Sequence, residues 1–173
     1  MLRIPKPEPD EYLAYYGKYI ALVGDDAIAA LRKQAAGTPR LLKGVSETQA
    51  MFRYAPGKWS VKEVLGHVMD GERVFGYRAL RFARADRTPL PGFDENTWVP
   101  AAGFDRRTMA ELAAEYEAVR AATLALFGSF DAAALVRRGA ANNAEVSVRA
   151  LAHIIAGHEL HHVGLLRERY GLA

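Results

Sequence analysis

Two histidines near the end of the sequence, His158 and His162, stand four residues apart. They lie within the run from Val148 to Tyr170, which otherwise has the apolar periodicity of a helix. Side chains at this spacing share one helix face and lie one turn apart, so both imidazoles can reach a single metal ion. The spacing therefore predicts either a site for a divalent metal or a hydrogen-bonded pair of buried histidines.

The surrounding residues place this pair in the middle of an apolar stripe. On a wheel of about 100° per residue, the two histidines share a face with Leu151, Ile155 and Leu166. An unpaired buried polar group costs about 1–3 kcal/mol, and a shared metal would satisfy both imidazoles. His153 projects away from the stripe, which predicts a surface position or one that supports a ligand from behind. His161 lies on the shoulder of the stripe and is the alternative ligand to its neighbour.

A catalytic metal site commonly has three protein ligands and one open position, so a third ligand is needed. A second periodic segment, which begins at the helix-capping residue Ser60, supplies a candidate. His67 lies at the border of its apolar stripe, a position typical of a residue that faces a pocket. Gly71, one turn further on, leaves space beside it. We therefore expect His67, His158 and His162 to bind one metal.

The same segment also has the H-E-x-x-H pattern of zinc proteases, in which the glutamate is the general base. Only eleven residues follow His162, and Leu165 and Glu168 stand where the extended protease motif needs glycine and histidine. On the helix, Glu159 points about 100° away from His158. We therefore disfavour a protease and expect Glu159 to be solvated or to support a ligand from behind.

Composition limits the class of protein and the ligands. A chain of 173 residues, half of them hydrophobic, is expected to form one domain over residues 1–173. The absence of cysteine excludes disulfide bonds, thiolate ligands and a cysteine nucleophile. The proline-rich start from Met1 to Pro9 is unlike a signal peptide, which predicts a cytoplasmic protein with no membrane partner. The net charge of +3 is not clustered, so nucleic-acid binding is not expected.

The remaining periodicity predicts an all-α protein. Helical spacing extends from about Asp10 to Gln34, with a break near Gly24 that divides it into two helices. Further long helices are predicted from Ser60 to Arg84, from Thr108 to Phe127 and from Ser147 onward. Nothing between them alternates apolar and polar residues for long enough to predict a sheet.

The connections carry two further predictions. The turn residues Gly37-Thr38-Pro39 are expected to end the first helical region, and a short helix is expected from Glu47 to Phe52. The segment from Asp86 to Arg107 contains three prolines and is too long for a plain bundle connection, so we expect it to cross or cover something. Trp98 within it would either close over a pocket or anchor the loop, and we favour anchoring.

Three segments of the sequence resemble motifs of the DinB/YfiT-like family. The stretch from Lys58 to His67 resembles the family's W-S-x-x-E-x-x-x-H helix start, and the stretch from Asp70 to Phe75 continues it. The stretch from Gly157 to His162 resembles its closing H-x-x-x-H segment. The resemblance extends over nearly the whole chain. It implies a four-helix bundle with up-down-down-up topology, in which the same three histidines hold a divalent metal, often zinc or nickel.

The resemblance also implies a range of activities. Family members include transferases and isomerases that use low-molecular-weight thiols such as bacillithiol or mycothiol, while many are described only as metal-dependent hydrolases. Homodimers are frequent. We therefore expect a thiol S-transferase with a small-molecule substrate and an external thiol. The alternatives are a hydrolase that uses metal-bound water and a non-enzymatic, stress-associated bundle that the metal only staples.

Arg78 is the predicted substrate-binding residue. It follows His67 and Val74 on the same helix face, and its guanidinium would bind a carboxylate of the thiol. The alternative is a surface ion pair with Asp70 or Glu72.

Overall fold

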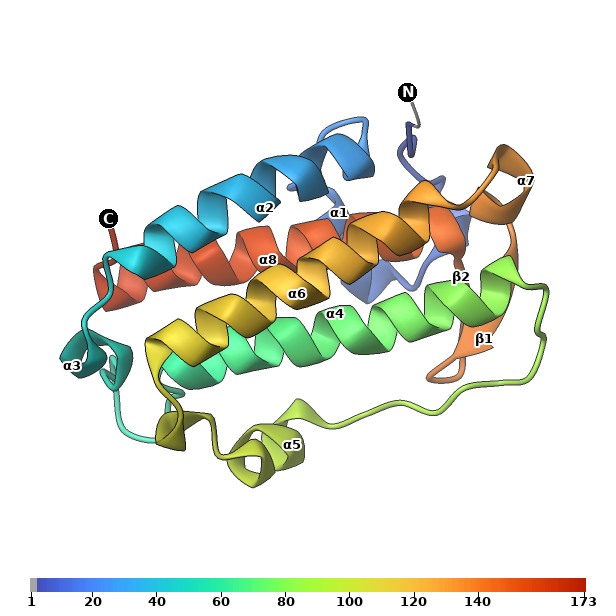
Figure 1. Cartoon of the computed structure of the whole chain (residues 1–173). Helices are drawn as coiled ribbons and strands as arrows, with labels where there is room; N and C mark the ends of the chain where they lie inside the picture. The colour runs from blue at the N-terminus through green and yellow to red at the C-terminus, as the bar shows by residue number, and fades with distance from the viewer. Residues whose placement is uncertain (1–2) are drawn as a thin grey trace.

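Four long helices lie side by side in a bundle. The structure is a computed structural model that describes residues 3–173, and Met1 and Leu2 of the proline-rich start lie outside these residues. The bundle helices are α2 (Ala27–Lys43), α4 (Val61–Ala83), α6 (Met109–Gly128) and α8 (Val148–Tyr170). Helices α4 and α6 run in one direction and α2 and α8 in the other, which is the predicted up-down-down-up topology (Figure 1).

The long helices begin where the sequence provides a side-chain cap. Ser60 and Thr108 open α4 and α6 with capping boxes, and the Ser147 hydroxyl accepts a hydrogen bond from the backbone at the start of α8. Helix α8 ends at Gly171, whose φ of 69° is the left-handed conformation that glycine adopts without strain. These local signals explain why the predicted boundaries of the three helices agree with the structure.

The N-terminal region differs from the prediction. A helix was expected from about Asp10, but this region is divided into short pieces. They are η1 (Pro9–Glu11), η2 (Ala14–Tyr16) and α1 (Gly17–Ile20). The predicted end at Gly37-Thr38-Pro39 was also wrong, because α2 continues through this turn to Lys43. Thr38 and Leu42 are buried one turn apart, and this packing outweighs the backbone hydrogen bond that Pro39 cannot donate. The short helix expected next is α3 (Glu47–Ala50).

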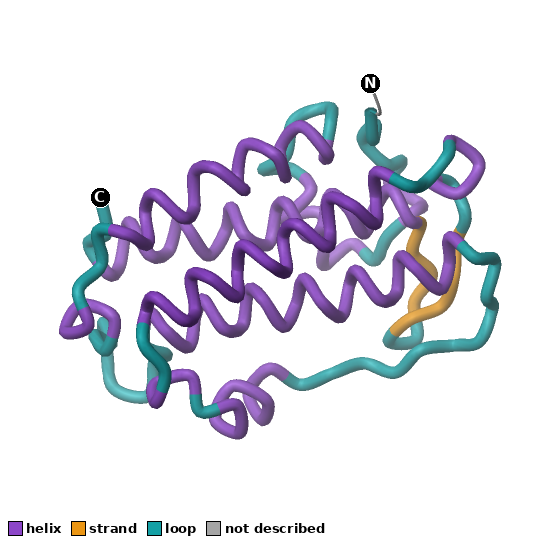
Figure 2. The backbone as a smooth tube through the Cα atoms, in the orientation of Figure 1, coloured by secondary structure: helices purple, strands orange, loops and turns teal. Residues whose placement is uncertain are grey.

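A small antiparallel hairpin separates α6 from α8, after the short helix α7 (Ala132–Leu135). Its strands are β1 (Arg138–Ala141) and β2 (Ala144–Ser147), drawn in orange in Figure 2. The expectation of no sheet was wrong at this place, since four-residue strands are too short for alternation to be recognised. Asn142 and Asn143 have φ values of 52° and 59°, as a tight hairpin turn requires and asparagine tolerates.

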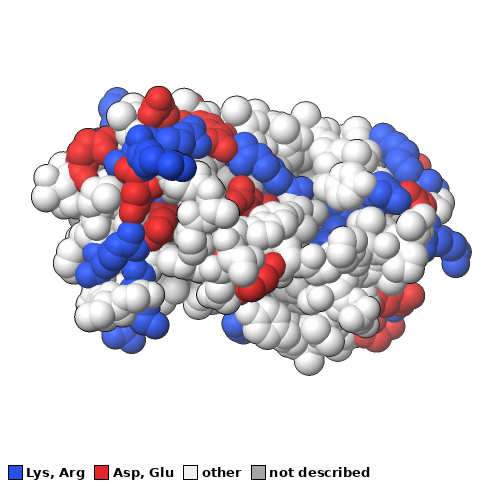
Figure 3. Space-filling view, turned by 90° about the horizontal axis from the view of Figure 1, so that it is seen from below, with Lys and Arg blue, Asp and Glu red and all other residues white. Residues whose placement is uncertain are grey.

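The connection between α4 and α6 travels the length of the bundle because these helices run in the same direction (Figure 1). It binds the hairpin where the backbone nitrogen of Leu90 donates to the carbonyl of Ala140 at 2.9 Å. It then forms α5 (Glu95–Ala102) and η3 (Phe104–Arg106) before α6 begins. On the face that carries this connection, charged side chains gather mainly toward the two ends (Figure 3).

Apolar residues from all four long helices form the core. Among them Leu31, Phe82, Phe127 and Leu151, one from each helix, are fully buried or nearly so. The bundle therefore holds its helices by a shared apolar interior, against which polar clusters must be positioned. None of the helices in the described part of the chain combines the length and the apolar character needed to cross a membrane.

Candidate metal centre

The three predicted ligands lie together between α4 and α8. Nε2 of His158 is 2.9 Å from Nε2 of His67 and 3.1 Å from Nε2 of His162. All three side chains are buried, and each offers a ring nitrogen to a common point. His158 and His162 share one face of α8, as their spacing predicted, and His67 borders a cavity, as its position on α4 predicted.

Hydrogen bonding alone does not satisfy this cluster. A neutral imidazole nitrogen either donates one hydrogen bond or accepts one, so Nε2 of His158 cannot complete good bonds to both neighbours. Nitrogen ligands at about 2.0–2.1 Å from a tetrahedral zinc stand about 3.3 Å apart, which is close to the two distances observed. The three histidines could therefore hold a divalent metal.

Glycines on two helices allow the close packing around His158. A Cβ at Gly71 would lie 3.2 Å from Cε1 of the His158 ring, so the space predicted at this position is used by the imidazole. A Cβ at Gly157 would lie 2.1 Å from the carbonyl oxygen of Tyr19, so α1 can approach α8 only because this residue is glycine. The Tyr19 ring consequently packs edge-on against His158, with ring centroids 5.4 Å apart.

Burial keeps the three imidazoles neutral. It lowers the pKa of His67 to about 4, although the charge of Glu95 acts in the opposite direction. It lowers the pKa of His162 to about 3, and that of His158 lies well below the ordinary value of 6.5. Only the neutral imidazole binds a metal, so the cluster has its ligand form at neutral pH.

The histidine cluster borders a cavity of about 370 Å³, which His67 and His158 line directly. Two charged side chains, Arg78 and Glu95, line the same cavity. Because Glu95 belongs to the long connection, the prediction that this segment covers something is confirmed. Aromatic rings form much of the remaining wall, and they belong to Tyr15, Tyr16, Tyr19, Phe75 and Phe93.

Arg78 is buried rather than on the surface. Its side chain is 4% exposed, its Nη2 donates to the carbonyl of Pro91 at 2.9 Å, and its guanidinium lies 6.0 Å from the centre of the Phe93 ring. The alternative surface ion pair with Asp70 or Glu72 was wrong, because these carboxylates pair with other arginines. Binding of a substrate carboxylate by Arg78 stays a prediction.

Trp98 lies beside the cavity and not in its wall. It is 43% exposed, and its ring packs on Phe93 with centroids 5.0 Å apart. Because Phe93 does line the cavity, Trp98 holds a wall residue from behind.

Glu159 has a different environment from the one predicted. It is 1% exposed and contacts none of the histidine nitrogens through a hydrogen bond, so the expectation that it is solvated or supports a ligand was wrong. Its carboxylate accepts hydrogen bonds from Tyr116 and Thr38 and pairs with Arg120. Arg120 in turn donates to Glu72 through Nε at 2.9 Å and Nη2 at 2.8 Å. No local pattern in the sequence indicates this network, because its members lie on four different helices.

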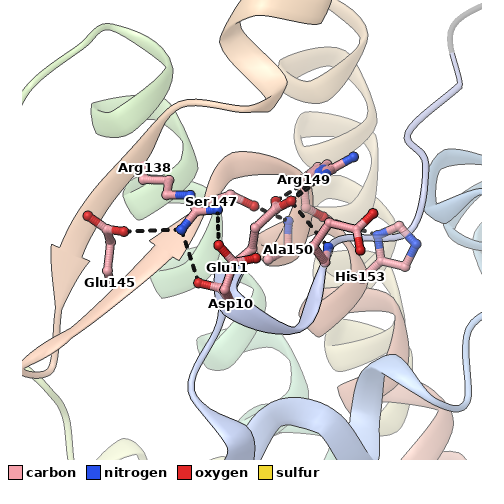
Figure 4. A network of polar contacts seen from close by, with 9 residues as sticks. Asp10, Glu11, Arg138, Glu145, Ser147, Arg149, Ala150 and His153 are labelled. Carbon is pink, nitrogen blue, oxygen red and sulfur yellow. Dashed lines mark hydrogen bonds and ion pairs between the residues drawn. The ribbon is translucent and has the colours of Figure 1, made fainter.

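The two remaining histidines of α8 lie outside the ligand cluster. His153 is fully buried, and the prediction of a surface position was wrong because the N-terminal region and the backbone near Gly24 cover this side of α8 (Figure 4). Its Nδ1 lies 3.1 Å from the carbonyl oxygen of Arg149. His161 is partly buried and packs against the Tyr19 ring, with centroids 5.4 Å apart, so it is a neighbour of the cluster and not a member.

Several wall residues were not anticipated from the sequence. Tyr16 and Tyr19 belong to a tyrosine-rich segment whose composition was a usable signal, although it was assigned to a plain helix. Glu95 carried no signal, since an isolated glutamate in a long connection is ordinary. Trp59, the residue before the Ser60 cap, packs on His67 with ring centroids 4.9 Å apart.

The chain is similar to known proteins over most of its length. The model of the DinB superfamily matches residues 30–166. Among solved structures, the chain is similar to YfiT from Bacillus subtilis, described as a probable metal-dependent hydrolase with an unusual four-helix bundle topology. The two share 16% sequence identity with a TM-score of 0.72, and the match covers 97% of this chain and 95% of that chain. None of the curated proteins matches the sequence.

Proposed function

The chain belongs to the DinB superfamily, and from this membership and the histidine geometry we propose that it is a metal-dependent enzyme of the thiol S-transferase type. His67, His158 and His162 would hold a divalent metal, zinc or nickel, beside the cavity that receives the substrates. One observation carries the proposal: three neutral, buried imidazoles converge on one point at the wall of a cavity.

A divalent cation bound there would supply Lewis-acid chemistry, lowering the pKa of a coordinated thiol or water toward neutrality. The chain contains no cysteine, so the thiol must come from a second small molecule. The protein's own part is to bind and orient. Aromatic rings of the wall, such as Phe75 and Phe93, would exclude water, and Arg78 would hold a carboxylate of the thiol or its substrate.

A hydrolase is the second candidate, favoured by the similarity to YfiT, which is described as a probable metal-dependent hydrolase. Water would then take the position of the thiol. The third alternative, a metal that only staples the helices, predicts a closed set of ligands. The cavity that borders His67 and His158 argues for an open position instead.

Metal binding is tested first, in wild type, His158→Ala and the matched control His161→Ala, whose ring lies beside the cluster but outside it. We expect about one zinc or nickel ion per chain in wild type and in the control, measured by elemental analysis after dialysis. His158→Ala should lose most of the bound metal, because only two ligands remain. Metal-free protein whose unfolding temperature does not change on addition of zinc or nickel would contradict the proposal.

Thiol transfer is then separated from hydrolysis with metal-loaded protein. We expect consumption of a reactive chloroarene or epoxide that requires both the metal and an added low-molecular-weight thiol. Turnover of an activated ester with metal and without thiol would instead support the hydrolase. A metal-loaded protein that does neither would favour the structural role.

We also propose that the chain forms a homodimer, as the family resemblance implies. Sedimentation equilibrium measures this directly, and a monomer mass at micromolar concentration would exclude it.

A further inference from the structure

Arg78 is a buried charge without a counter-ion. It is 4% exposed, and within residues 3–173 its guanidinium forms no ion pair. Burial lowers its pKa, and among residues 3–173 the hydroxyl of Tyr16 acts in the opposite direction. The cation also lies over the Phe75 ring, 5.7 Å from its centre. An unpaired buried charge is costly, so a residue of this kind is typical of a site that receives an anion.

Glu95 is the complementary case on the same cavity. It is the first residue of α5, its side chain is half-buried, and across the described residues it makes no ion pair or side-chain hydrogen bond. Its charge acts on the nearby His67. Although Arg78 lines the same cavity, the two charges do not pair with each other.

The other buried or partly buried carboxylates, lysines and arginines among residues 3–173 are paired. Arg120 pairs with Glu72 and Glu159, and Arg149 pairs with Glu11. Folding therefore brings opposite charges together elsewhere and leaves two of them separate in one aromatic cavity. Such an arrangement is complementary to a ligand that itself carries both charges.

We propose that the cavity beside the histidines binds a small zwitterion, with its carboxylate at Arg78 and its ammonium group at Glu95. The apolar part of the ligand would lie against Phe75 and Phe93. The inference rests on the proposed function only in identifying this zwitterion as the substrate or the thiol of the enzyme. The binding site itself uses residues other than the three histidines.

A series of ω-amino acids from 3-aminopropanoate to 6-aminohexanoate tests the proposal, with calorimetry as the measurement. The alkanoate and the alkylamine of each length serve as probes with a single charge. We expect at least one amino acid to bind about tenfold more tightly than both of its analogues, because each charge-assisted contact contributes. The absence of this advantage at every length would overturn the proposal.

Variants assign the two charges. Arg78→Gln should lose about tenfold in affinity for the amino acid and the alkanoate but not for the alkylamine, and Glu95→Gln should show the opposite pattern. Arg73→Gln on α4 and Glu117→Gln on α6 remove exposed charges and are the matched controls. They should leave the affinities for the amino acid, the alkanoate and the alkylamine unchanged. Thermal unfolding of each variant verifies the fold. An advantage that survives in both cavity variants would also overturn the proposal.

Parallel titrations of metal-free and metal-loaded protein separate this proposal from the proposed function. Zwitterion binding by a protein that takes up no metal would support the cavity assignment and contradict the enzyme. Metal uptake without any zwitterion advantage would do the reverse.

Discussion

Helix α8 carries two buried polar clusters on different faces, and they differ in how completely their polar groups are paired. On one face, Glu159 belongs to a closed network in which Arg120, Glu72, Tyr116 and Thr38 satisfy one another. On the other face, the neighbouring residue His158 belongs to an open cluster of three imidazoles beside two unpaired charges. Adjacent residues of one helix thus take part in opposite arrangements.

The pairing of polar groups also distinguishes two cavities that border α8. A larger cavity, about 630 Å³, lies between α2 and α8 and is lined by Gln34, Thr38 and Glu159. Its buried polar side chains are paired within the protein: Gln34 Nε2 donates to the carbonyl of Ala156 at 2.7 Å, and Thr38 donates to Glu159. The smaller cavity has the unsatisfied groups. Polar and charged side chains without partners indicate where a ligand binds better than the volume of a cavity does.

The largest effect is expected from opening the closed network. Arg120→Met would leave Glu72 and Glu159 buried without their cation, which costs about 3–5 kcal/mol of unfolding free energy. Urea unfolding followed by circular dichroism measures this loss. The metal ligands lie outside the network, so any variant that still folds should keep its metal.

The same substitution at Arg78, beside the open cluster, is the control. Arg78→Met removes a charge that has no counter-ion, so the unfolding free energy should stay unchanged or rise. Equal losses in the two arginine variants would mean that the clusters do not differ in the way described.

An intermediate effect is expected where α1 meets α8. Gly157→Ala would force the Tyr19 backbone away and displace the ring that packs on His158, at a cost of about 1–3 kcal/mol. Gly164→Ala lies in the same helix with no atom within 4 Å of the added Cβ, and should stabilise by about 0.5–1 kcal/mol. Chemical denaturation of both variants, with metal affinity as a second readout, measures the difference. Equal stabilisation would show that α1 does not approach α8 so closely.

A smaller effect is expected from removing one donor of the closed network. Tyr116→Phe deletes the hydroxyl that lies 2.8 Å from the Glu159 carboxylate, which keeps its contacts with Thr38 and Arg120. The expected loss is about 1 kcal/mol of unfolding free energy. A loss as large as that of the Arg120 variant, measured in the same urea titration, would contradict the idea that the partners share this charge.

The last effect is local, a dependence on pH where the N-terminal region meets α8. Burial raises the pKa of Glu11, but hydrogen bonds, chiefly from Arg149, outweigh it and lower the pKa from 4.5 to about 2. Because the pKa is lower in the folded state, the ion pair stabilises the fold above pH 4.5, and this contribution is lost as the pH falls toward 2. Figure 4 shows how the pair fastens the N-terminal region to α8.

Amide hydrogen exchange near Tyr16 should therefore accelerate as the pH falls through this range, after correction for the intrinsic pH dependence of exchange. Glu11→Gln should exchange faster already at neutral pH and lose this acceleration. An unchanged profile in the variant would assign the acid sensitivity to another group.

Much of the fold followed from local signals. Caps at Ser60, Thr108 and Ser147 determine where three bundle helices begin, because each supplies the hydrogen bond that a helix start needs. The extension of α2 through Pro39 was not predictable in this way, since it depends on tertiary packing. The topology came from the resemblance to a family, as helix periodicity does not specify how helices are ordered in space.

The candidate site was predictable where it depends on one helix and not where it depends on several. The spacing of His158 and His162 is a property of a single helix, and His67 follows from the need for a third ligand. The burial of His153 depends on the N-terminal region, and that of Glu159 on Arg120, 39 residues away in the sequence. No local pattern records such contacts.

The parallel course of α4 and α6 has a consequence for how this protein can diversify. The histidines belong to the rigid helices, whereas Phe93 and Glu95 belong to the connection that the parallel course requires. Insertions or exchanges within that connection would remodel what the cavity accepts and leave the ligand-bearing helices untouched. The same helix bundle could thereby be adapted to new small molecules by changes in the sequence of a single connecting segment.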